Sequence, residues 1–225
     1  AIVPMSKPPE IHTDVRLESP SSNANPIVVE ITRGTVVESR HRGSAVVVDP
    51  DGHVIASWGD IEAPVFPRSA IKSVQAIPLI ETGAAEAFGL GNKEISLACA
   101  SHNGEQKHVD VISAWLEKIG LNETNLECGT HWPFDREAAR SLIKLGKNPS
   151  TLHNNCSGKH AAMLTTVRHM SESTKGYVRI EHPCQQRVMG TLEAMCGLNF
   201  DDVPRGIDGC AIPTFSIPLG NIALA

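Results

Sequence analysis

A serine and a lysine three residues apart are the first residues in this chain whose types and spacing suit catalysis. Ser69 and Lys72 are the first and last residues of a Ser-Ala-Ile-Lys run at the expected start of a helix. Residues three apart share one helix face, so the lysine amine can reach the serine hydroxyl. A desolvated lysine near a helix N-terminus has a lowered pKa and can act as the base for a serine nucleophile. The same spacing recurs at Ser141 and Lys144, where no neighbouring motif supports catalysis.

A second group of candidate residues combines two cysteines with another lysine. Cys156 and Lys159 lie three residues apart in a Cys-Ser-Gly-Lys-His run at the expected start of an apolar helix, so both can point at one place. Cys210 follows an Asp-Gly pair that predicts a sharp turn. Two thiolates and one nitrogen would leave the fourth position of a zinc ion open, the pattern of a functional site. The competing interpretation is a helix cap at Cys156 and a buried cysteine in a turn at Cys210.

The run Ser-His-Asn-Gly-Glu at residues 101–105 adds a further hydroxyl. Ser101 stands next to His102, but neighbours on a loop or strand rarely face each other, so a serine–histidine pair is not expected. Asn103 stands three residues before Gln106, a capping-box spacing that favours the start of a helix there. His102 and His108 are possible metal ligands without a convincing partner pair.

Composition and charge narrow the class of protein. The chain of 225 residues is 41% hydrophobic and 20% charged, which is typical of a globular protein. Its formal net charge of -5 gives no basic footprint for nucleic acid. It has no apolar run of the ~18 residues that a membrane span needs and no N-terminal signal pattern, so we expect a cytoplasmic protein without nucleic-acid or membrane partners. Its six cysteines include no Cys-x-x-Cys spacing.

The elements expected around these residues are β-strands followed by helices. Four short β-rich runs, the last two joined by a Pro-Asp-Gly turn, predict adjacent strands of one antiparallel sheet at 27–32, 35–38, 45–48 and 54–58. Pro78 is expected to kink or end the first helix. Helices are expected at 69–82, 92–100, 106–119, 136–145, 159–170 and 183–196. The predicted fold class is α/β (α+β), an antiparallel sheet with a helical domain at 26–225, after a mobile leader at 1–25.

Four separated motifs occur here in the same order as in one known family. They read Arg-Ser-Ala-Ile-Lys-Ser-Val-Gln-Ala from Arg68, Cys-Ala-Ser-His-Asn-Gly-Glu from Cys99, Asn-Cys-Ser-Gly-Lys-His from Asn155 and Asp-Gly-Cys-x-x-Pro from Asp208. From about residue 27 to 225 the chain resembles the asparaginase II family, the rhizobial-type L-asparaginases. The resemblance implies a fold similar to that of serine β-lactamases and glutaminases. It also implies hydrolysis of L-asparagine to L-aspartate and ammonia.

The resemblance also implies roles for individual residues. Ser69 would be the nucleophile, Lys72 its base, and Ser101 a second serine that relays protons or orients the amide. Cys156, Lys159 and Cys210 would be the ligands of a Zn2+ ion. Arg68 and Asp208 would be parts of the substrate pocket. A carboxylate such as Asp208 suits the α-ammonium group of the substrate. The family also suggests a homodimer.

One departure and two alternatives accompany the resemblance. Family members continue beyond the Asp-Gly-Cys segment with closing strands and a second lysine that partners the second serine, whereas this chain ends at Ala225. We therefore expect the 225-residue chain by itself to be weakly active or inactive. One alternative is a glutaminase or an acyl hydrolase of the penicillin-binding type. The other is a non-catalytic zinc-binding module, in which the cysteines and Lys159 are purely structural.

Overall fold

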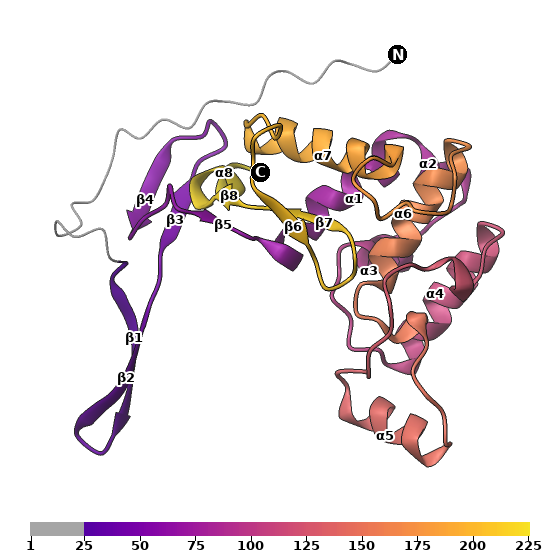
Figure 1. Cartoon of the computed structure of the whole chain (residues 1–225), viewed down its shortest axis with the longest axis horizontal. Coiled ribbons are helices and arrows are strands. Elements are labelled where there is room, and N and C mark those ends of the chain that lie inside the picture. The colour runs from indigo at the N-terminus through magenta and orange to yellow at the C-terminus, as the bar shows by residue number, and fades with distance from the viewer. Residues whose placement is uncertain (1–24) are drawn as a thin grey trace. The chain divides into compact units, whose positions relative to one another are not determined.

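The described part of the chain, residues 25–225 of a computed structural model, divides into two compact units (Figure 1). Unit 1 contains residues 25–67, 193–204 and 215–225, and unit 2 contains residues 68–192 and 205–214. Helices and antiparallel strands both occur, which confirms the predicted mixed fold class. Apart from residue 25, the predicted leader at 1–25 lies outside the described residues.

Unit 1 is built mainly from paired strands. β1 (Ile27–Arg33) pairs antiparallel with β2 (Val36–Arg42), β3 (Ala45–Val48) with β4 (Val54–Trp58), and β5 (Pro64–Val65) with β8 (Ile217–Pro218), which leads into α8 (Leu219–Leu224). The predicted turn between β3 and β4 is confirmed. There the Asp49 carboxylate accepts hydrogen bonds from the backbone N–H groups of Asp51 and His53, at 3.0 and 2.8 Å.

The prediction that the first four strands form one sheet is wrong. β1–β2 and β3–β4 are separate two-stranded sheets within residues 25–225. Every residue of β1 is exposed, including Val28 at 59% and Val29 at 50%. β1 therefore has no buried apolar face that would fix its register within a larger sheet. Residue type and alternation identify a strand, but they do not decide which strand pairs with it.

Unit 2 is mainly helical. Its α-helices are α1 (Lys72–Glu81), α2 (Ala84–Ala87), α3 (Asn92–Ala98), α4 (Gln106–Lys118), α5 (Arg136–Lys144), α6 (Ser157–His169) and α7 (Pro183–Cys196), the last of which continues into unit 1. Short 3-10 turns are η1 (Arg68–Ile71), η2 (Glu123–Asn125) and η3 (Thr151–His153), and the strands β6 (Arg205–Ile207) and β7 (Pro213–Phe215) pair with each other. No helix of the described residues is both long enough and apolar enough to cross a bilayer.

α6 is the central helix of unit 2. It is buried without interruption from Ser157 to Val167 and packs against α1, α3 and α4. A helix covered on all sides belongs to the interior of a domain. Its first residues, which carry the Cys-Ser-Gly-Lys-His run, are therefore inside unit 2 rather than on its surface.

The first helix ends as predicted, just before Gly83, whose φ of 77° lies in the left-handed region. Pro78 does not end it early, since α1 continues to Glu81. Its start differs from the prediction, because residues 69–71 belong to the 3-10 turn η1. The predicted capping box before α4 is absent. The residue at its N-cap is Glu105, and the side chain of Glu105 makes no capping hydrogen bond.

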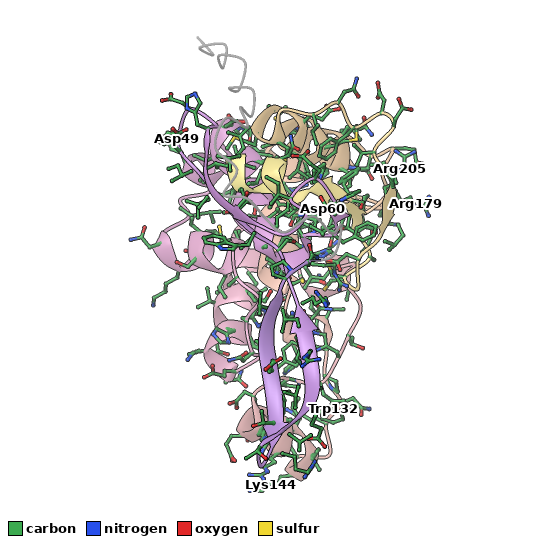
Figure 2. All side chains as sticks on the ribbon, turned by 90° about the vertical axis from the view of Figure 1, so that its left-hand side faces the viewer. Asp49, Asp60, Trp132, Lys144, Arg179 and Arg205 are labelled. Carbon is green, nitrogen blue, oxygen red and sulfur yellow. The ribbon has the colours of Figure 1, made fainter. Side chains whose placement is uncertain are left out.

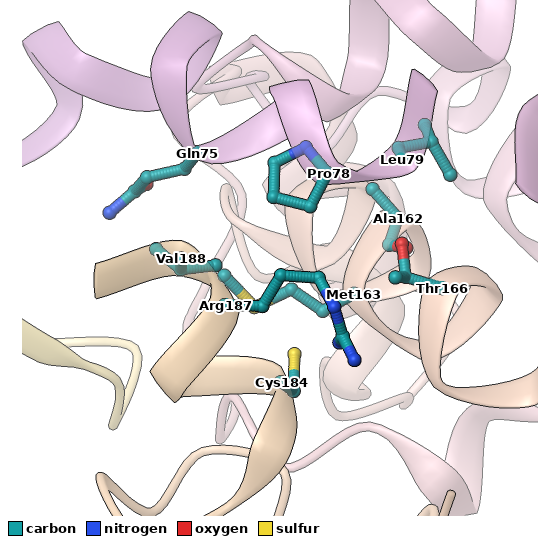
Figure 3. Close-up of a pocket in the computed structure, with 9 residues that line it drawn as sticks. All are labelled: Gln75, Pro78, Leu79, Ala162, Met163, Thr166, Cys184, Arg187 and Val188. Carbon is teal, nitrogen blue, oxygen red and sulfur yellow. The ribbon is translucent and has the colours of Figure 1, made fainter. Parts of the chain in front are cut away.

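A small cavity lies among α1, α6 and α7 (Figure 3). Its free volume of about 10 Å³ would hold roughly one water molecule. Gln75 presents to it a buried side chain whose Oε1 has no hydrogen-bond partner within residues 25–225. The cavity is too small for an amino-acid substrate, so the candidate site has to be sought elsewhere in unit 2.

The backbone of α3 lies close to α6 at Gly158. A Cβ atom at this position would lie 2.8 Å from the carbonyl carbon of Leu97, closer than real Cβ atoms come to other heavy atoms. Gly158 stands between Cys156 and Lys159, and Leu97 stands shortly before Ser101. The contact therefore fixes how close the two candidate motifs can come to each other.

We predict that Gly158→Ala lowers the free energy of unfolding by about 1–3 kcal/mol, because the added methyl group overlaps backbone atoms that cannot move aside. Gly190→Ala is the matched control. Gly190 also lies within a helix, but a Cβ there meets no atom within 4 Å, so alanine should be neutral or stabilise by up to about 1 kcal/mol. Urea unfolding of both variants measures the difference, and equal effects would contradict the close contact.

Candidate active site

The Lys72 amine occupies the centre of the candidate site. The residue is 1% exposed, and its Nζ donates hydrogen bonds to the Ala100 carbonyl oxygen at 2.7 Å and to the Ser101 hydroxyl at 2.8 Å. Burial lowers the pKa of Lys72 below its ordinary value, the Cys156 thiol opposes this shift, and the positive charge of Lys159 adds to it. A lysine with a lowered pKa that touches a serine hydroxyl is a competent proton acceptor.

The structure places Ser69 differently from the sequence prediction. Its hydroxyl makes no hydrogen bond within residues 25–225, and Lys72 contacts Ser101 instead. Ser69 lies in the 3-10 turn η1, and Lys72 is the first residue of α1. Arg68 has a φ of 51°, a strained conformation for a residue with a side chain, which sets the direction of the chain into this turn. Ser69 is exposed and accessible to a substrate.

The two candidate cysteines and the second lysine converge in the interior. Cys156 precedes α6, Lys159 lies in its first turn, Cys210 lies in the β6–β7 turn, and all three are 5% exposed or less. The Lys159 Nζ donates a hydrogen bond to the Cys210 Sγ at 3.2 Å. A hydrogen bond from Cys210 lowers the pKa of Cys156 to about 6 against the opposing effect of burial, and Lys159 and Lys72 lower it further. The same hydrogen bond and burial raise the pKa of Cys210 to about 11.

This donor set fits a zinc ion in its chemistry. Zn2+ binds thiolate sulfur and neutral nitrogen, and two sulfurs with one amine leave a fourth position for water or substrate. Another group of possible ligand atoms, from Asp49, Asp51 and His53, lies within 4.8 Å of one another in unit 1. There the Asp49 carboxylate already holds the β3–β4 turn.

The two predicted substrate-binding residues form an ion pair with each other. The Arg68 Nε lies 2.6 Å from the Asp208 Oδ1; the side chain of Arg68 is 62% exposed and that of Asp208 only 9%. The same Asp208 oxygen accepts the Gly209 backbone N–H at 2.8 Å. Ala211, at the end of this turn, has a φ of 72°, a second strained residue beside the site. An exposed guanidinium next to a carboxylate can receive an amino acid, which carries both opposite charges.

His102 joins the Ser101 loop to the start of α6. Its Nδ1 accepts the Gly104 N–H at 3.1 Å, so the proton resides on Nε2, which donates to the Ser157 hydroxyl at 2.8 Å. Ser157 in turn donates to the Leu152 carbonyl at 2.9 Å, and the His102 N–H donates to the Asn155 carbonyl at 3.1 Å. The sequence alone did not indicate this link, because its partners are 55 residues apart.

Two asparagines attach the loop before α6 to a third segment. The Asn154 side chain donates to the Cys128 carbonyl at 2.8 Å and accepts the Cys156 N–H at 2.8 Å. The Asn155 N–H donates to the His131 Nε2 at 2.9 Å. The sequence suggested a polar cap at this position, but the N-cap residue Cys156 makes no capping hydrogen bond with its side chain. The two asparagines instead connect segments distant in the chain.

The second Ser-x-x-Lys copy lies on the surface. Ser141 and Lys144 belong to α5, a helix with no buried residue, and Lys144 is displayed at its end (Figure 2). Trp132, which is 44% exposed, is another surface residue of unit 2 (Figure 2). Burial of the lysine therefore distinguishes Lys72 from its sequence duplicate.

Comparison with known proteins assigns the chain to a class. The family model of L-asparaginase II matches residues 29–225, and no curated protein sequence matches at a significant level. Since the match covers most of the chain, the chain belongs to the L-asparaginase II family. The family supports an asparaginase-type amidohydrolase activity in general terms.

We predict that His102 makes folding stability dependent on pH. Burial lowers the pKa of His102 from 6.5 to about 4, with nearby positive charges adding to the effect. Between these values the unfolded chain binds more protons than the folded one, so stability falls as the pH drops from 6.5 towards 4, by up to about 3 kcal/mol. Urea unfolding at several pH values should show a flatter dependence for His102→Gln than for wild type. The exposed His41→Gln is the control, and identical slopes for His102→Gln and wild type would contradict the prediction.

Proposed function

We propose that unit 2 hydrolyses L-asparagine to L-aspartate and ammonia, with Ser69 as nucleophile and Lys72 as base. One observation carries the proposal: the buried Lys72 amine, with its pKa lowered, lies 2.8 Å from the Ser101 hydroxyl in a member of the L-asparaginase II family. Ser69 precedes Lys72 by three residues and offers an exposed hydroxyl. Ser101 then serves as the proton relay between the two.

Substrate binding would use the Arg68–Asp208 pair. L-Asparagine carries an α-ammonium and an α-carboxylate, which match the Asp208 carboxylate and the Arg68 guanidinium respectively. Arg68 adjoins Ser69 in the chain, so a substrate held by this pair would bring its side-chain amide towards the Ser69 hydroxyl. Orientation of this kind lowers the barrier by removing the entropic cost of bringing the reacting atoms together.

The reaction would proceed in two steps. In the first, the Ser69 oxygen bonds to the side-chain amide carbon while its proton passes to the Lys72 amine. The carbon–nitrogen bond then breaks, ammonia leaves with that proton, and an aspartyl ester remains on Ser69. In the second step, water attacks the ester with Lys72 again accepting the proton, and L-aspartate departs as the proton returns to Ser69.

Cys156, Lys159 and Cys210 would hold a zinc ion beside this site. A bound Zn2+ would supply Lewis-acid polarisation of a carbonyl oxygen. The residues themselves contribute a negative sulfur next to Lys72, because the Cys156 thiol has a pKa of about 6. Two effects on the pKa of Lys72 therefore oppose each other: burial lowers it and Cys156 raises it.

Two further readings would be separated by experiment. A glutaminase would need space for one extra methylene, a difference of only about 1–3 kcal/mol in discrimination. A purely structural zinc module would unfold on chelation and would be indifferent to Ser69. The homodimer suggested by the family also stays a prediction.

We predict that Ser69→Ala lowers ammonia release from L-asparagine at least about 1,000-fold, because the nucleophile is lost. Ser101→Ala should lower it by about 100-fold or more through loss of the proton relay. Ser141→Ala, on the exposed copy of the motif, is the matched control and should leave the rate unchanged. If Ser69→Ala retains turnover while Ser101→Ala abolishes it, Ser101 is the nucleophile. Residues 1–225 by themselves are expected to be weakly active or inactive, so the wild-type rate is measured first. No ammonia release from wild type would contradict catalysis by this chain alone.

We predict that Cys156→Ala and Cys210→Ala lose bound zinc, because each removes one of the sulfur ligands on which affinity depends. Cys99→Ser, at an exposed cysteine, should retain zinc and serve as the control. Elemental analysis of the purified chains gives the zinc content. Ser69→Ala should also retain zinc, which separates loss of the nucleophile from loss of the metal. Full zinc content in both cysteine variants would rule out this site.

A further inference from the structure

A groove on unit 2 is lined by charged side chains that the proposed reaction does not use. It lies between residues 124–127 and the turn at 174–179, and its volume is about 520 Å³. Apart from Gly176 and Val178, every residue that lines it has a polar or charged side chain. Sites for small molecules have volumes of roughly 300–1,000 Å³ and are mostly apolar. The size of this groove suits a small molecule, and its polar lining favours a charged one.

Two positive charges of the groove have no negative partner. Lys175 and Arg179 are both exposed, and neither forms an ion pair with any of residues 25–225. Arg179 is among the surface residues that Figure 2 labels. Its side chain lies beside Gly176, where a Cβ atom would stand 3.5 Å from the Arg179 Cδ and 3.7 Å from its Nε. Single exposed cations are ordinary on a protein surface, but here two of them line one concave site.

The negative charge of the groove belongs to Glu127, which neutralises neither cation. Its Oε1 accepts the Gly176 backbone N–H at 2.8 Å, whereas its Oε2 makes no hydrogen bond within residues 25–225. Gly176 is therefore in contact with the Glu127 carboxylate and with the Arg179 side chain, although these two form no ion pair with each other. A carboxylate and a guanidinium that adjoin one glycine without pairing are both available to a charged ligand.

The two walls of the groove are attached to each other before any ligand binds. Tyr177 follows Gly176, is 0% exposed, and accepts the Glu127 backbone N–H on its hydroxyl at 3.0 Å. This hydrogen bond and the one between Glu127 and Gly176 join the two walls. Gly176 has a φ of 71°, which glycine adopts without strain. A groove whose backbone is already fixed loses little conformational entropy when a ligand binds.

We propose that this groove binds a small acidic amino acid of the type of L-aspartate or L-glutamate. Such a molecule carries two carboxylates and one ammonium group, which complement the two cations and the one carboxylate of the groove. Its carboxylates would face Lys175 and Arg179, and its ammonium group would face the free Oε2 of Glu127. The groove contains none of the residues of the proposed reaction, so the inference does not depend on that reaction.

The first test locates the binding site and the cations that form it. L-Aspartate is titrated at low salt into the full chain labelled with 15N, and the backbone amide signal of Gly176 is followed. We expect this signal to shift in wild type and the affinity to fall about 2- to 5-fold in Lys175→Gln and in Arg179→Gln, the range of exposed ion pairs. The double variant should bind about 5- to 25-fold more weakly. Lys144→Gln, at an exposed lysine of α5, is the matched control and should bind as wild type does.

The second test concerns the ammonium group of the ligand. Succinate has the same two carboxylates as L-aspartate but no ammonium group, so wild type should bind it more weakly than L-aspartate. Glu127→Gln keeps an oxygen that can accept the Gly176 N–H but removes the negative charge. This variant should therefore lose the preference for L-aspartate over succinate. If wild type binds succinate or inorganic phosphate as tightly as L-aspartate, the groove is a general anion site and the proposal is overturned.

A further variant separates this groove from the candidate active site, because L-aspartate is also the product of the proposed reaction. A chain with both Arg68→Gln and Asp208→Asn should still show the Gly176 shift with the affinity of wild type. Loss of the shift in that chain, or wild-type affinity in the Lys175→Gln, Arg179→Gln double variant, would overturn the proposal. Absence of any Gly176 shift in wild type would do the same. These measurements need no turnover, so a chain that releases no ammonia still tests the groove.

Discussion

The contact between Gly158 and Leu97 is the constraint on which the candidate site depends. With no side chain at 158, the start of α6 lies against the backbone at the end of α3. Ser101 follows shortly after Leu97, and Cys156 and Lys159 flank Gly158. Close packing at this one point therefore brings a hydroxyl and a group of sulfur and nitrogen atoms into the same small volume. Any added methyl group would separate them.

A second requirement is that polar groups inside unit 2 have partners. Lys72 is satisfied by a carbonyl and the Ser101 hydroxyl, and Lys159 by the Cys210 sulfur. His102 links the Ser101 loop to the start of α6 through Ser157. Buried charges without partners are costly, so these hydrogen bonds stabilise the fold while they orient the reactive atoms. The residues that could perform chemistry are thus also part of the packing of unit 2.

The electrostatics of the site follow from this burial. Desolvation alone lowers the pKa of Lys72 and raises that of a thiol. The hydrogen bond between Cys156 and Cys210 instead moves the pKa values of the two thiols in opposite directions. The pKa of Cys156 falls to about 6 and that of Cys210 rises to about 11. A negatively charged sulfur and nearby amines thus lie together inside unit 2. This arrangement is compatible with metal binding and with base catalysis, because each group shifts the pKa of its neighbour.

The sequence by itself determined the residue types, the order of the motifs and most helices, because these depend on local spacing and hydrophobic periodicity. It identified Lys72 and Cys210 as candidates, but it predicted a Ser69–Lys72 contact where the structure has Lys72 on Ser101. It also predicted one sheet of four strands, whereas these strands pair as two separate hairpins. Only the tertiary structure decided these contacts and the role of His102, since their partners come from distant segments whose meeting depends on packing rather than on spacing along the chain.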